Sequence, residues 1–408
     1  MVENMTNLDA LRKLVNNMAA AQILVVGDIM LDRYFYGKVS RISPEAPVPV
    51  LHVARQGRML GGAGNVIRNL DGLKVKTHLI GIIGDDSEGS IVTTMLDSLQ
   101  HVCDPADGLL ISDRPTTVKS RFVASNQQLL RVDEENKRYI NADEEDRILA
   151  KIKSHITDCQ VIILSDYDKG VLTPKLIREV IDLANAHGVK TLVDPKGNDY
   201  SIYSGAYAVT PNRDELSKAT NNAATIEDGE VVNAANKLIE TSGIQNVVAT
   251  RSEDGMTIVQ GRGKDHAQRP VHIPTEALEV FDVSGAGDTV IATIAAALAA
   301  GADLVEAARI ANIAGGVVVA KTGTAPIRAE EILERLTAQH EDDKTLDSKV
   351  DHSPTMQASI AQIKNWDEAK RQIDEWQRHG MRVGLTNGCF DLLHPGHVQY
   401  LHTAPGTV

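Results

Sequence analysis

Short apolar runs alternate with segments of helical periodicity along most of the chain, and this alternation restricts the possible folds more than any other feature. The runs that predict strands lie at residues 22–26, 76–80, 161–164, 191–193 and 247–250. The segments that predict helices lie at residues 64–71, 88–99, 144–156, 174–187 and 231–242. Such βα units favour an α/β fold with a doubly wound, mainly parallel sheet between helices. Ligands of such a sheet bind beyond the carboxyl ends of the strands.

Two extended segments interrupt the alternation. Residues 33–53 and 116–133 resemble ribbons, and three prolines in the first exclude a central strand. We expect both to form a small antiparallel β lid over the mouth of the main sheet. Further helices are predicted at residues 286–300, 304–320 and 329–338, which would complete a first domain at residues 1–338.

The remaining chain predicts a linker and a second, shorter segment. Residues 339–360 are polar and predict the linker. A helix at residues 366–379 and a strand at residues 383–386 would begin an incomplete Rossmann-like α/β segment at residues 361–408.

The composition argues against several classes of protein. Aromatic residues make up only 3% of the chain, so Val, Ile, Leu and Ala must fill the core. A formal charge of −13 argues against nucleic-acid binding, although a local basic pocket for a phosphorylated metabolite is compatible with it. Three scattered cysteines indicate neither a disulfide framework nor structural zinc. The chain shows no signal peptide and no apolar run of about 18 residues, so we expect a cytoplasmic protein that does not bind membranes.

The stretch EVFDVSGAGDTVIATIAAALAAG carries the clearest sign of chemistry. Gly285, Ala286 and Gly287 lie where a loop becomes a long apolar helix, and small residues there let backbone N–H groups surround an anion. Asp288 follows in the first helical turn, where a carboxylate can accept a proton from a substrate hydroxyl that attacks a phosphoryl group. The alternative is a plain helix start, with Asp288 complementing the helix dipole.

Two earlier stretches suggest a site for a polyhydroxy ligand. In MLGGAGNVIRNL, Gly61 and Gly62 permit close backbone approach, and Asn65 can both donate and accept hydrogen bonds. A glycine-rich turn that packs a helix on a sheet is the alternative. In VVGDIMLDRY, Asp28 and Asp32 end the first strand, where carboxylates can bind sugar hydroxyls or cap the next element.

Residues 21–327 resemble the ribokinase-like (phosphofructokinase B) carbohydrate kinases. GGAGNVIRNL is similar to the first signature of that family and DVSGAGDTV to the second, in the family's order and roughly 220 residues apart. The stretches GIIGDDSEG, SDYDKGVL, VDPKG and TPNRDEL match between them. The resemblance implies a sugar kinase that uses ATP with Mg²⁺ and forms a homodimer through its lid. It leaves open whether a monovalent cation also binds.

The resemblance also implies a role for each matching position. Asp288 would be the general base, and Gly285, Ala286 and Gly287 would form the anion hole. The positions expected to bind ATP are Asn212, Arg213, Asp214, Glu215, Thr250, Arg251 and Asn312. Among these, the N-x-x-E pattern would organise the Mg–ATP phosphates through water, so no residue would bind the metal directly. The positions expected to hold the sugar are Asp32, Gly61, Gly62 and Asn65.

The stretch TNGCFDLLHPGH resembles the cytidylyltransferase-like nucleotidyltransferases, in which two histidines, here His394 and His397, contact nucleotide phosphates. A kinase followed by this segment resembles the bifunctional family that makes ADP-heptose for the lipopolysaccharide core. That family phosphorylates D-glycero-β-D-manno-heptose 7-phosphate at its anomeric O1 and adenylylates heptose 1-phosphate. Because a stable domain needs more than about 50 residues, we expect the histidines to be a remnant and adenylyl transfer to be absent.

The phosphate already on such a sugar would require cations, and the lid offers several. Lys119 and Arg121 alternate in TTVKSRF, so a strand would present both on one face. Arg131 and Lys169 are further candidates. The alternative for these cations is a solvated strand edge. Three other functions remain open: a kinase for another sugar or a nucleoside, a nucleotidyltransferase, and a sugar or nucleotide sensor without catalysis.

Overall fold

The computed structural model describes residues 2–124, 127–261, 269–276, 280–321, 324–347 and 370. Contacts divide the chain into two units, Met1–Thr345 and Leu346–Val408, and the described residues belong almost entirely to the first. His394 and His397, the predicted remnant of a nucleotidyltransferase motif, lie outside the described residues. Within the described part, no helix has the length and apolar character needed to cross a membrane.

A nine-stranded sheet forms the centre of the first unit, in the order β13-β12-β11-β10-β9-β8-β1-β4-β5. The strands are β1 (Gln22–Gly27), β4 (Lys76–Gly84), β5 (Leu109–Ser112), β8 (Val161–Ser165), β9 (Lys190–Asp194), β10 (Ala208–Val209), β11 (Asn246–Thr250), β12 (Met256–Gln260) and β13 (Val271–Ile273). β12 runs antiparallel to β11 and β13, whereas the other neighbouring pairs are parallel. The prediction of a mainly parallel sheet is therefore confirmed.

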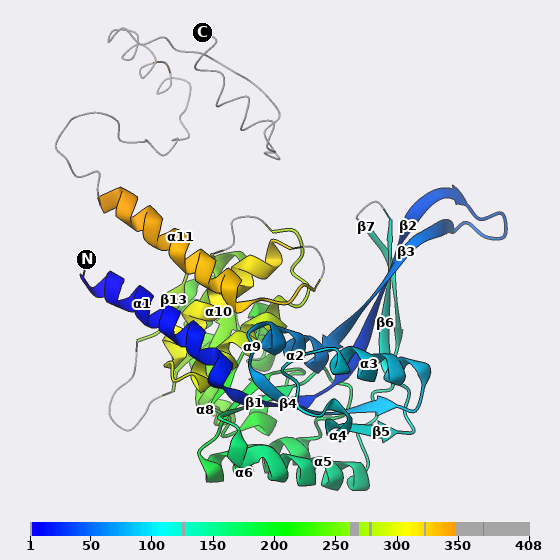
Figure 1. Cartoon of the computed structure of the whole chain (residues 1–408), viewed down its shortest axis with the longest axis horizontal. Coiled ribbons are helices and arrows are strands. Elements are labelled where there is room, and N and C mark those ends of the chain that lie inside the picture. Colours follow the sequence, from blue (N-terminus) through cyan, green and yellow to red (C-terminus); the bar gives the residue numbers. More distant parts are fainter. Residues whose placement is uncertain are drawn as a thin grey trace. The chain divides into compact units, whose positions relative to one another are not determined.

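Helices cover both faces of this sheet (Figure 1). One apolar cluster packs on helices α1 (Val2–Asn17), α2 (Ala63–Gly72), α3 (Ser87–Asp97), α9 (Ala286–Ala299), α10 (Leu304–Val319) and α11 (Ala329–Asp347). The other packs on α5 (Ala142–His155), α6 (Pro174–His187), α7 (Arg213–Ala219) and α8 (Asp228–Ser242). In β1, Ile23 and Val25 belong to the first cluster, and Leu24 and Val26 to the second, because successive strand side chains point to opposite faces. Helix α11 continues past residue 338, where we expected it to end.

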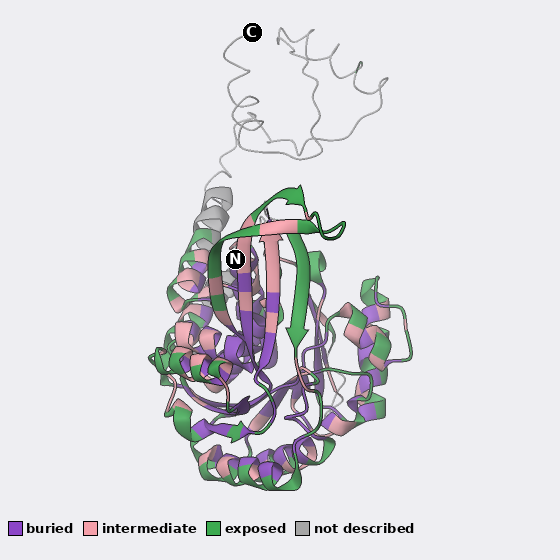
Figure 2. Ribbon diagram, turned by 90° about the vertical axis from the view of Figure 1, so that its right-hand side faces the viewer, coloured by how far each residue is buried: buried purple, intermediate pink, exposed green. Residues whose placement is uncertain are grey.

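A four-stranded sheet extends from one side of the main sheet and forms the lid (Figures 1 and 2). Its order is β3-β2-β6-β7, with β2 (Ile29–Ile42), β3 (Pro49–Gly62), β6 (Thr117–Ala124) and β7 (Gln127–Glu134). The expectation of a purely antiparallel lid is wrong, because β2 and β6 pair in parallel. β2 follows β1 and β6 follows β5, so both strands leave the parallel main sheet from the carboxyl ends of its strands and run outward in the same direction.

Candidate active site

Asp288 lies in the first turn of α9 and is 4% exposed. Both oxygens of its carboxylate accept a hydrogen bond. Asn65 Nδ2 donates to Oδ2 at 2.7 Å, and the Tyr167 hydroxyl donates to Oδ1 at 2.6 Å. Helix α2 carries Asn65 and packs against α9, where Thr289 Oγ1 donates to Asn69 Oδ1 at 2.9 Å. The contact between these two helices therefore holds Asn65 beside the carboxylate.

Burial raises the pKa of Asp288 to about 6, and the charge of Asp32 acts in the same direction. The hydrogen bonds from Tyr167 and Asn65 oppose this rise because they stabilise the ionised carboxylate. A carboxylate with a pKa just below neutrality is ionised at pH 7 and still basic enough to take a proton. The predicted base therefore lies in surroundings that suit general-base chemistry.

The glycines before Asp288 keep the start of α9 open. Gly285 is the N-cap residue with φ of 79°, and a Cβ built there would lie 2.6 Å from Asn65 Nδ2. A Cβ at Gly287 would meet no atom within 4 Å, so the helix start faces open space at that position. N–H groups in the first turn of a helix lack intrahelical acceptors, so they can bind an anion placed in this space. The Ala286 N–H is an exception, because it donates to the Val283 carbonyl at 3.2 Å.

A cavity of about 430 Å³ adjoins this helix start. Four of the predicted site residues line it, namely Thr250, Ala286, Gly287 and Asn312. The Asn312 side chain also donates to the Pro274 carbonyl at 2.7 Å, which fixes its position in the wall. Most of the other lining residues are apolar or glycine, namely Gly255, Met256, Val280, Val283, Val290, Gly315, Gly316 and Val319, whereas Ser252, Glu253 and Thr275 are polar. Such a wall suits the planar base of a nucleotide, with its phosphates directed toward the start of α9.

A second cavity, of about 470 Å³, lies far from this chemistry. Gln160, His187 and Lys190 line it, next to the amino ends of β8 and β9. Sites in open parallel sheets lie at the opposite, carboxyl ends of the strands. We therefore place the candidate active site at the cavity beside α9, although the second cavity is slightly larger.

The N-x-x-E pattern forms a capping box at the start of α7. Asn212 Oδ1 accepts from the Glu215 N–H at 2.9 Å, and Glu215 Oε2 accepts from the Asn212 N–H at 3.0 Å. The other Glu215 oxygen pairs with Lys196 Nζ at 2.6 Å. Arg213 pairs with Asp254, and Asp214 is exposed. These contacts explain the pattern as a helix start, and the proposed contact with Mg–ATP stays a prediction.

Arg251 does not line the cavity, although Thr250 beside it does. Its buried guanidinium pairs with Asp228 at 2.6 Å and donates to Thr257 Oγ1 at 3.1 Å. This engagement turns the side chain toward the start of α8. Its predicted role in holding nucleotide phosphates stays untested.

The predicted sugar-binding residues Asp32, Gly61 and Gly62 lie on the paired strands β2 and β3, and Asn65 lies on α2. Asp32 is buried and pairs with Arg121 of β6. A Cβ at Gly61 would lie 2.4 Å from Asp32 Oδ2, so only glycine leaves room for this carboxylate. Gly62 has φ of 58°, and a Cβ there would lie 2.4 Å from the Asp28 carbonyl. The two glycines thus bring Asp32 and the start of α2, which carries Asn65, close together.

Asp28 has a structural role that sequence reasoning left open. Its buried carboxylate accepts from the backbone N–H groups of Tyr167 at 2.9 Å, Lys169 at 3.0 Å and Val171 at 3.1 Å. Sugar binding by Asp28, which the sequence left open, stays untested. The carboxylate holds the loop that follows β8 in a fixed conformation.

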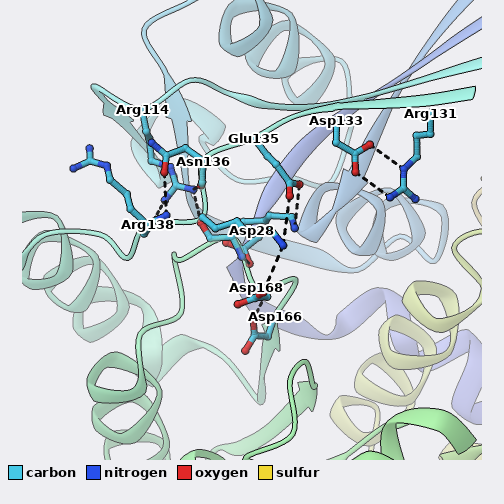
Figure 3. A network of polar contacts seen from close by, with 11 residues as sticks. Asp28, Arg114, Arg131, Asp133, Glu135, Asn136, Arg138, Asp166 and Asp168 are labelled. Carbon is cyan, nitrogen blue, oxygen red and sulfur yellow. Dashed lines mark hydrogen bonds and ion pairs between the residues drawn. The ribbon is translucent and has the colours of Figure 1, made fainter.

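The four candidate cations differ in their partners, and Figure 3 shows one of them, Arg131, beside Asp133. Arg121 pairs with Asp32, and Arg131 makes a bidentate contact with Asp133 at 2.9 Å for both bonds. Lys169 pairs with Glu135 at 3.0 Å. Within the described part of the chain, Lys119 has no acidic oxygen within 4 Å of its ammonium. Burial lowers the pKa of Lys119, and nearby Lys169 adds to this effect.

Two residues near Asp288 were not identified from the sequence. Tyr167 lies in SDYDKGVL and Asp194 in VDPKG, and both stretches were recognised only as matches to the family. Burial raises the pKa of Asp194 well above its usual range, and the charges of Asp288 and Glu215 add to the rise. The position of both residues after a predicted strand, at the edge where ligands bind, was the available signal. The described residues contain no group of three or more His, Cys, Asp or Glu side chains arranged for a metal ion.

Comparisons with known proteins place the chain in a family. Residues 20–331 match the pfkB family carbohydrate kinases. A relative named "Bifunctional protein HldE" from Paramagnetospirillum magneticum is 46% identical over 402 residues, which cover 98% of this chain and 78% of the relative. Another of that name from Rhodospirillum rubrum is 43% identical over 395 residues, covering 97% of this chain and 75% of the relative.

Solved structures show the same fold. Phosphofructokinase-2 from Escherichia coli in complex with potassium aligns with a TM-score of 0.64 and 19% identity, covering 78% of this chain and 99% of that one. Ribokinase from Arabidopsis thaliana with ribose and ATP aligns with a TM-score of 0.59 and 18% identity, covering 78% of this chain and 98% of that one. Together with the relatives, these matches show that the chain is a carbohydrate kinase of the pfkB family and belongs with the proteins named bifunctional protein HldE.

Proposed function

We propose that the chain transfers the γ-phosphoryl group of ATP to the anomeric O1 of D-glycero-β-D-manno-heptose 7-phosphate. The products would be ADP and heptose 1,7-bisphosphate, a step toward ADP-heptose for the lipopolysaccharide core. The observation that carries the proposal is the buried Asp288 carboxylate beside an open helix start and a nucleotide-sized cavity. The kinship with proteins named HldE supports the choice of a heptose.

In the proposed reaction, Asp288 takes the proton of the sugar hydroxyl as the hydroxyl oxygen attacks the γ-phosphorus in line. The bond to the β,γ-bridging oxygen breaks, and ADP leaves with the electron pair. The N–H groups of Gly285 and Gly287 would stabilise the negative charge on the transferred group, since preorganised donors at such a position favour the transition state. Asp32, Gly61, Gly62 and Asn65 would hold the sugar, because they lie at the same end of α2 as the base.

Magnesium carried by ATP fits the acidic residues at this edge of the sheet. The pKa of Asp194 is raised well above its usual range, partly by the negative charges of Asp288 and Glu215, so a cation here would relieve repulsion. Asn212, Glu215 and Asp194 would hold hydrated Mg²⁺, and the ion would neutralise phosphate charge. ATP itself would occupy the cavity lined by Thr250 and Asn312. We assign no residue to a monovalent cation.

Lys119 is the lid cation best suited to the phosphate that the sugar already carries. It lies beside Asp32 in the parallel register of β2 and β6, so it faces the same side as the predicted sugar-binding residues. Arg121, Arg131 and Lys169 each have a carboxylate partner. In the described part of the chain, Lys119 has no acidic oxygen within 4 Å. A bound phosphate would therefore be the first close counter-ion of Lys119. Arg121 would then serve to orient Asp32.

The lid also supports the proposal of a homodimer. Apolar side chains are exposed along its strands and at the tip of the β2–β3 hairpin, among them Ile42 (61% exposed), Val48 (51%) and Leu130 (56%). Exposed apolar residues gathered on one element often mark a protein interface. We expect a second copy of this chain to cover them. A solution mass equal to one chain at micromolar concentration, measured by light scattering, would contradict this expectation.

An ADP-release assay with a panel of acceptors tests the substrate. The panel consists of heptose 7-phosphate, the unphosphorylated heptose, fructose 6-phosphate, ribose and a nucleoside. We expect the highest kcat/KM for heptose 7-phosphate, because Lys119 would bind its phosphate. If another acceptor is preferred, the chain is a kinase for that acceptor, and the heptose assignment is wrong.

A further inference from the structure

The hydroxyl of Tyr167 makes the shortest contact to the predicted base. Its distance of 2.6 Å to Asp288 Oδ1 falls within the roughly 2.5–2.7 Å that is typical of a hydroxyl bonded to an ionised carboxylate. Tyr167 is only half-buried, whereas Asp288 is almost fully buried. Neither nucleotide binding nor sugar binding, as proposed above, uses this tyrosine.

Together with Asn65, Tyr167 restricts the carboxylate. Asn65 Nδ2 bonds Oδ2 at 2.7 Å while Tyr167 bonds Oδ1, so rotation of the carboxyl group would break one bond or both. Each carboxylate oxygen can accept two hydrogen bonds. One acceptor position on each oxygen therefore remains available to a substrate hydroxyl, in a direction fixed by the two donors.

The loop that carries Tyr167 is itself held in place (Figure 3). The Asp28 carboxylate accepts from the Tyr167 N–H and from two further N–H groups of the same loop. Asp168 and Gly170 have φ of 55° and 89°, and a Cβ at Gly170 would lie 2.1 Å from the Arg138 carbonyl. The loop therefore has little freedom, and the phenol ring has a defined starting point.

The same loop contacts the segment that follows the lid. Arg114 donates to the Lys169 carbonyl within the loop and to the Asn136 carbonyl at 2.7 Å. The Lys169 side chain pairs with Glu135 at 3.0 Å. The position of Tyr167 thus depends on contacts on both sides, and its hydroxyl is directed at one carboxylate oxygen.

We infer that Tyr167 is a positioning residue for the catalytic base, which orients the Asp288 carboxylate toward the sugar hydroxyl and stabilises its ionised form. The inference rests on the proposed role of Asp288 as the base. Tyr167 touches the base and acts through it, and no contact with the reacting atoms is required. The inference therefore predicts that loss of the Tyr167 hydroxyl changes turnover and its pH dependence, with little effect on substrate binding.

The sign of the pH effect follows from the environment of Asp288. Burial raises its pKa to about 6, and the hydrogen bond from Tyr167 lowers it. Removal of the hydroxyl should raise the pKa further, so a higher pH is needed to ionise the base. Turnover requires the ionised base and is lost as the pH falls through this pKa, so the acid limb should move to higher pH.

Tyr167→Phe in the full chain tests the inference, with Tyr207→Phe as the matched control. Tyr207 lies over Lys190 near the amino end of β9, away from Asp288. We expect Tyr167→Phe to move the acid limb of kcat upward by roughly one pH unit. This shift should lower kcat about fivefold near pH 6 and approach about tenfold well below pH 6, since one unit corresponds to tenfold. KM for ATP and for heptose 7-phosphate should stay within about twofold, and raising the pH should restore part of kcat. Tyr207→Phe should match the unmodified chain.

A cycle with Asp288→Asn separates positioning from other roles. If Tyr167 acts through the base, the double variant should be no slower than Asp288→Asn alone. An unshifted acid limb in Tyr167→Phe, or a further full loss in the double variant, would overturn the inference. If Asp288→Asn itself keeps full turnover, the proposed base is wrong.

A titration that needs no substrate distinguishes failure of the inference about Tyr167 from failure of the proposed function. In protein labelled with [¹³Cγ]aspartate, the resonance absent from Asp288→Asn belongs to Asp288. We expect it to titrate near pH 6 in the unmodified chain and at higher pH in Tyr167→Phe. Equal titration in both contradicts the role of Tyr167, even if heptose 7-phosphate turns out not to be the substrate. A shifted titration without turnover supports Tyr167 and contradicts the substrate alone.

Discussion

Replacement of Asp288 by asparagine should lower kcat by about 10²–10⁴-fold, the usual contribution of a positioned general base. Asparagine keeps the size of the side chain and can still accept a hydrogen bond from Asn65 or Tyr167, but it cannot take a proton. ATP affinity should persist, because the nucleotide cavity is lined by other residues, among them Thr250 and Asn312. The measurement is steady-state ADP release together with calorimetric titration of ATP.

Asp303→Asn is a suitable control for this substitution. Asp303 is an exposed N-cap of α10, and asparagine caps a helix about as well as aspartate. Turnover of the control should therefore be close to that of the unmodified chain. If Asp288→Asn retains turnover within a fewfold of the control, Asp288 is not the base, and the proposed mechanism fails.

Replacement of Lys119 by alanine should raise KM for heptose 7-phosphate by about 10- to 150-fold, because a hydrogen bond to a charged group contributes roughly 1.5–3 kcal/mol. The half-buried ammonium has no acidic partner within 4 Å in the described part of the lid, so its favourable contacts should come largely from the substrate. The pKa of Lys119 is lowered by burial and by Lys169, and a bound phosphate would oppose both effects. Turnover at saturating sugar should change much less.

Two comparisons make this result specific. Arg131→Ala removes a cation of the same sheet whose guanidinium already contacts Asp133 twice, and we expect less than about a threefold change in KM, in line with exposed ion pairs. The unphosphorylated heptose should lose little affinity in Lys119→Ala. An equal rise in KM for both sugars would mean that Lys119 does not bind the phosphate.

The main sheet and its helices were predictable because strands that are buried on both faces appear in the sequence as short apolar runs. Strands such as β1 and β8 are short, largely apolar runs between helical segments, and this alternation identifies them. β5, β10, β12 and β13 were not predicted. β10 has only two residues, and β13 has three, of which only one is buried. The parallel pairing of β2 with β6 was also missed, because pairing direction depends on how the main sheet orients the two strands and not on their composition.

The site was predictable where one short stretch contains the chemistry, as with Gly285 to Asp288. The surroundings of Asp288 were not, because Asn65 and Tyr167 approach it from other parts of the chain and only the packed fold brings them together. Sequence could not decide whether Asp28 binds sugar hydroxyls or caps the next element. In the structure, three backbone N–H groups of the loop after β8 donate to its carboxylate. Likewise, the alternation of Lys119 and Arg121 predicts a shared face but not that Asp32 pairs with Arg121.

The central claim is that this chain phosphorylates the anomeric hydroxyl of a sugar that already carries a phosphate. Its most direct test is ³¹P NMR of a mixture of the chain, Mg–ATP and heptose 7-phosphate. The account predicts that each ADP formed is matched by a new phosphomonoester coupled to the anomeric proton, while the 7-phosphate signal persists. Release of ADP without that signal, or phosphate on another carbon, would contradict it.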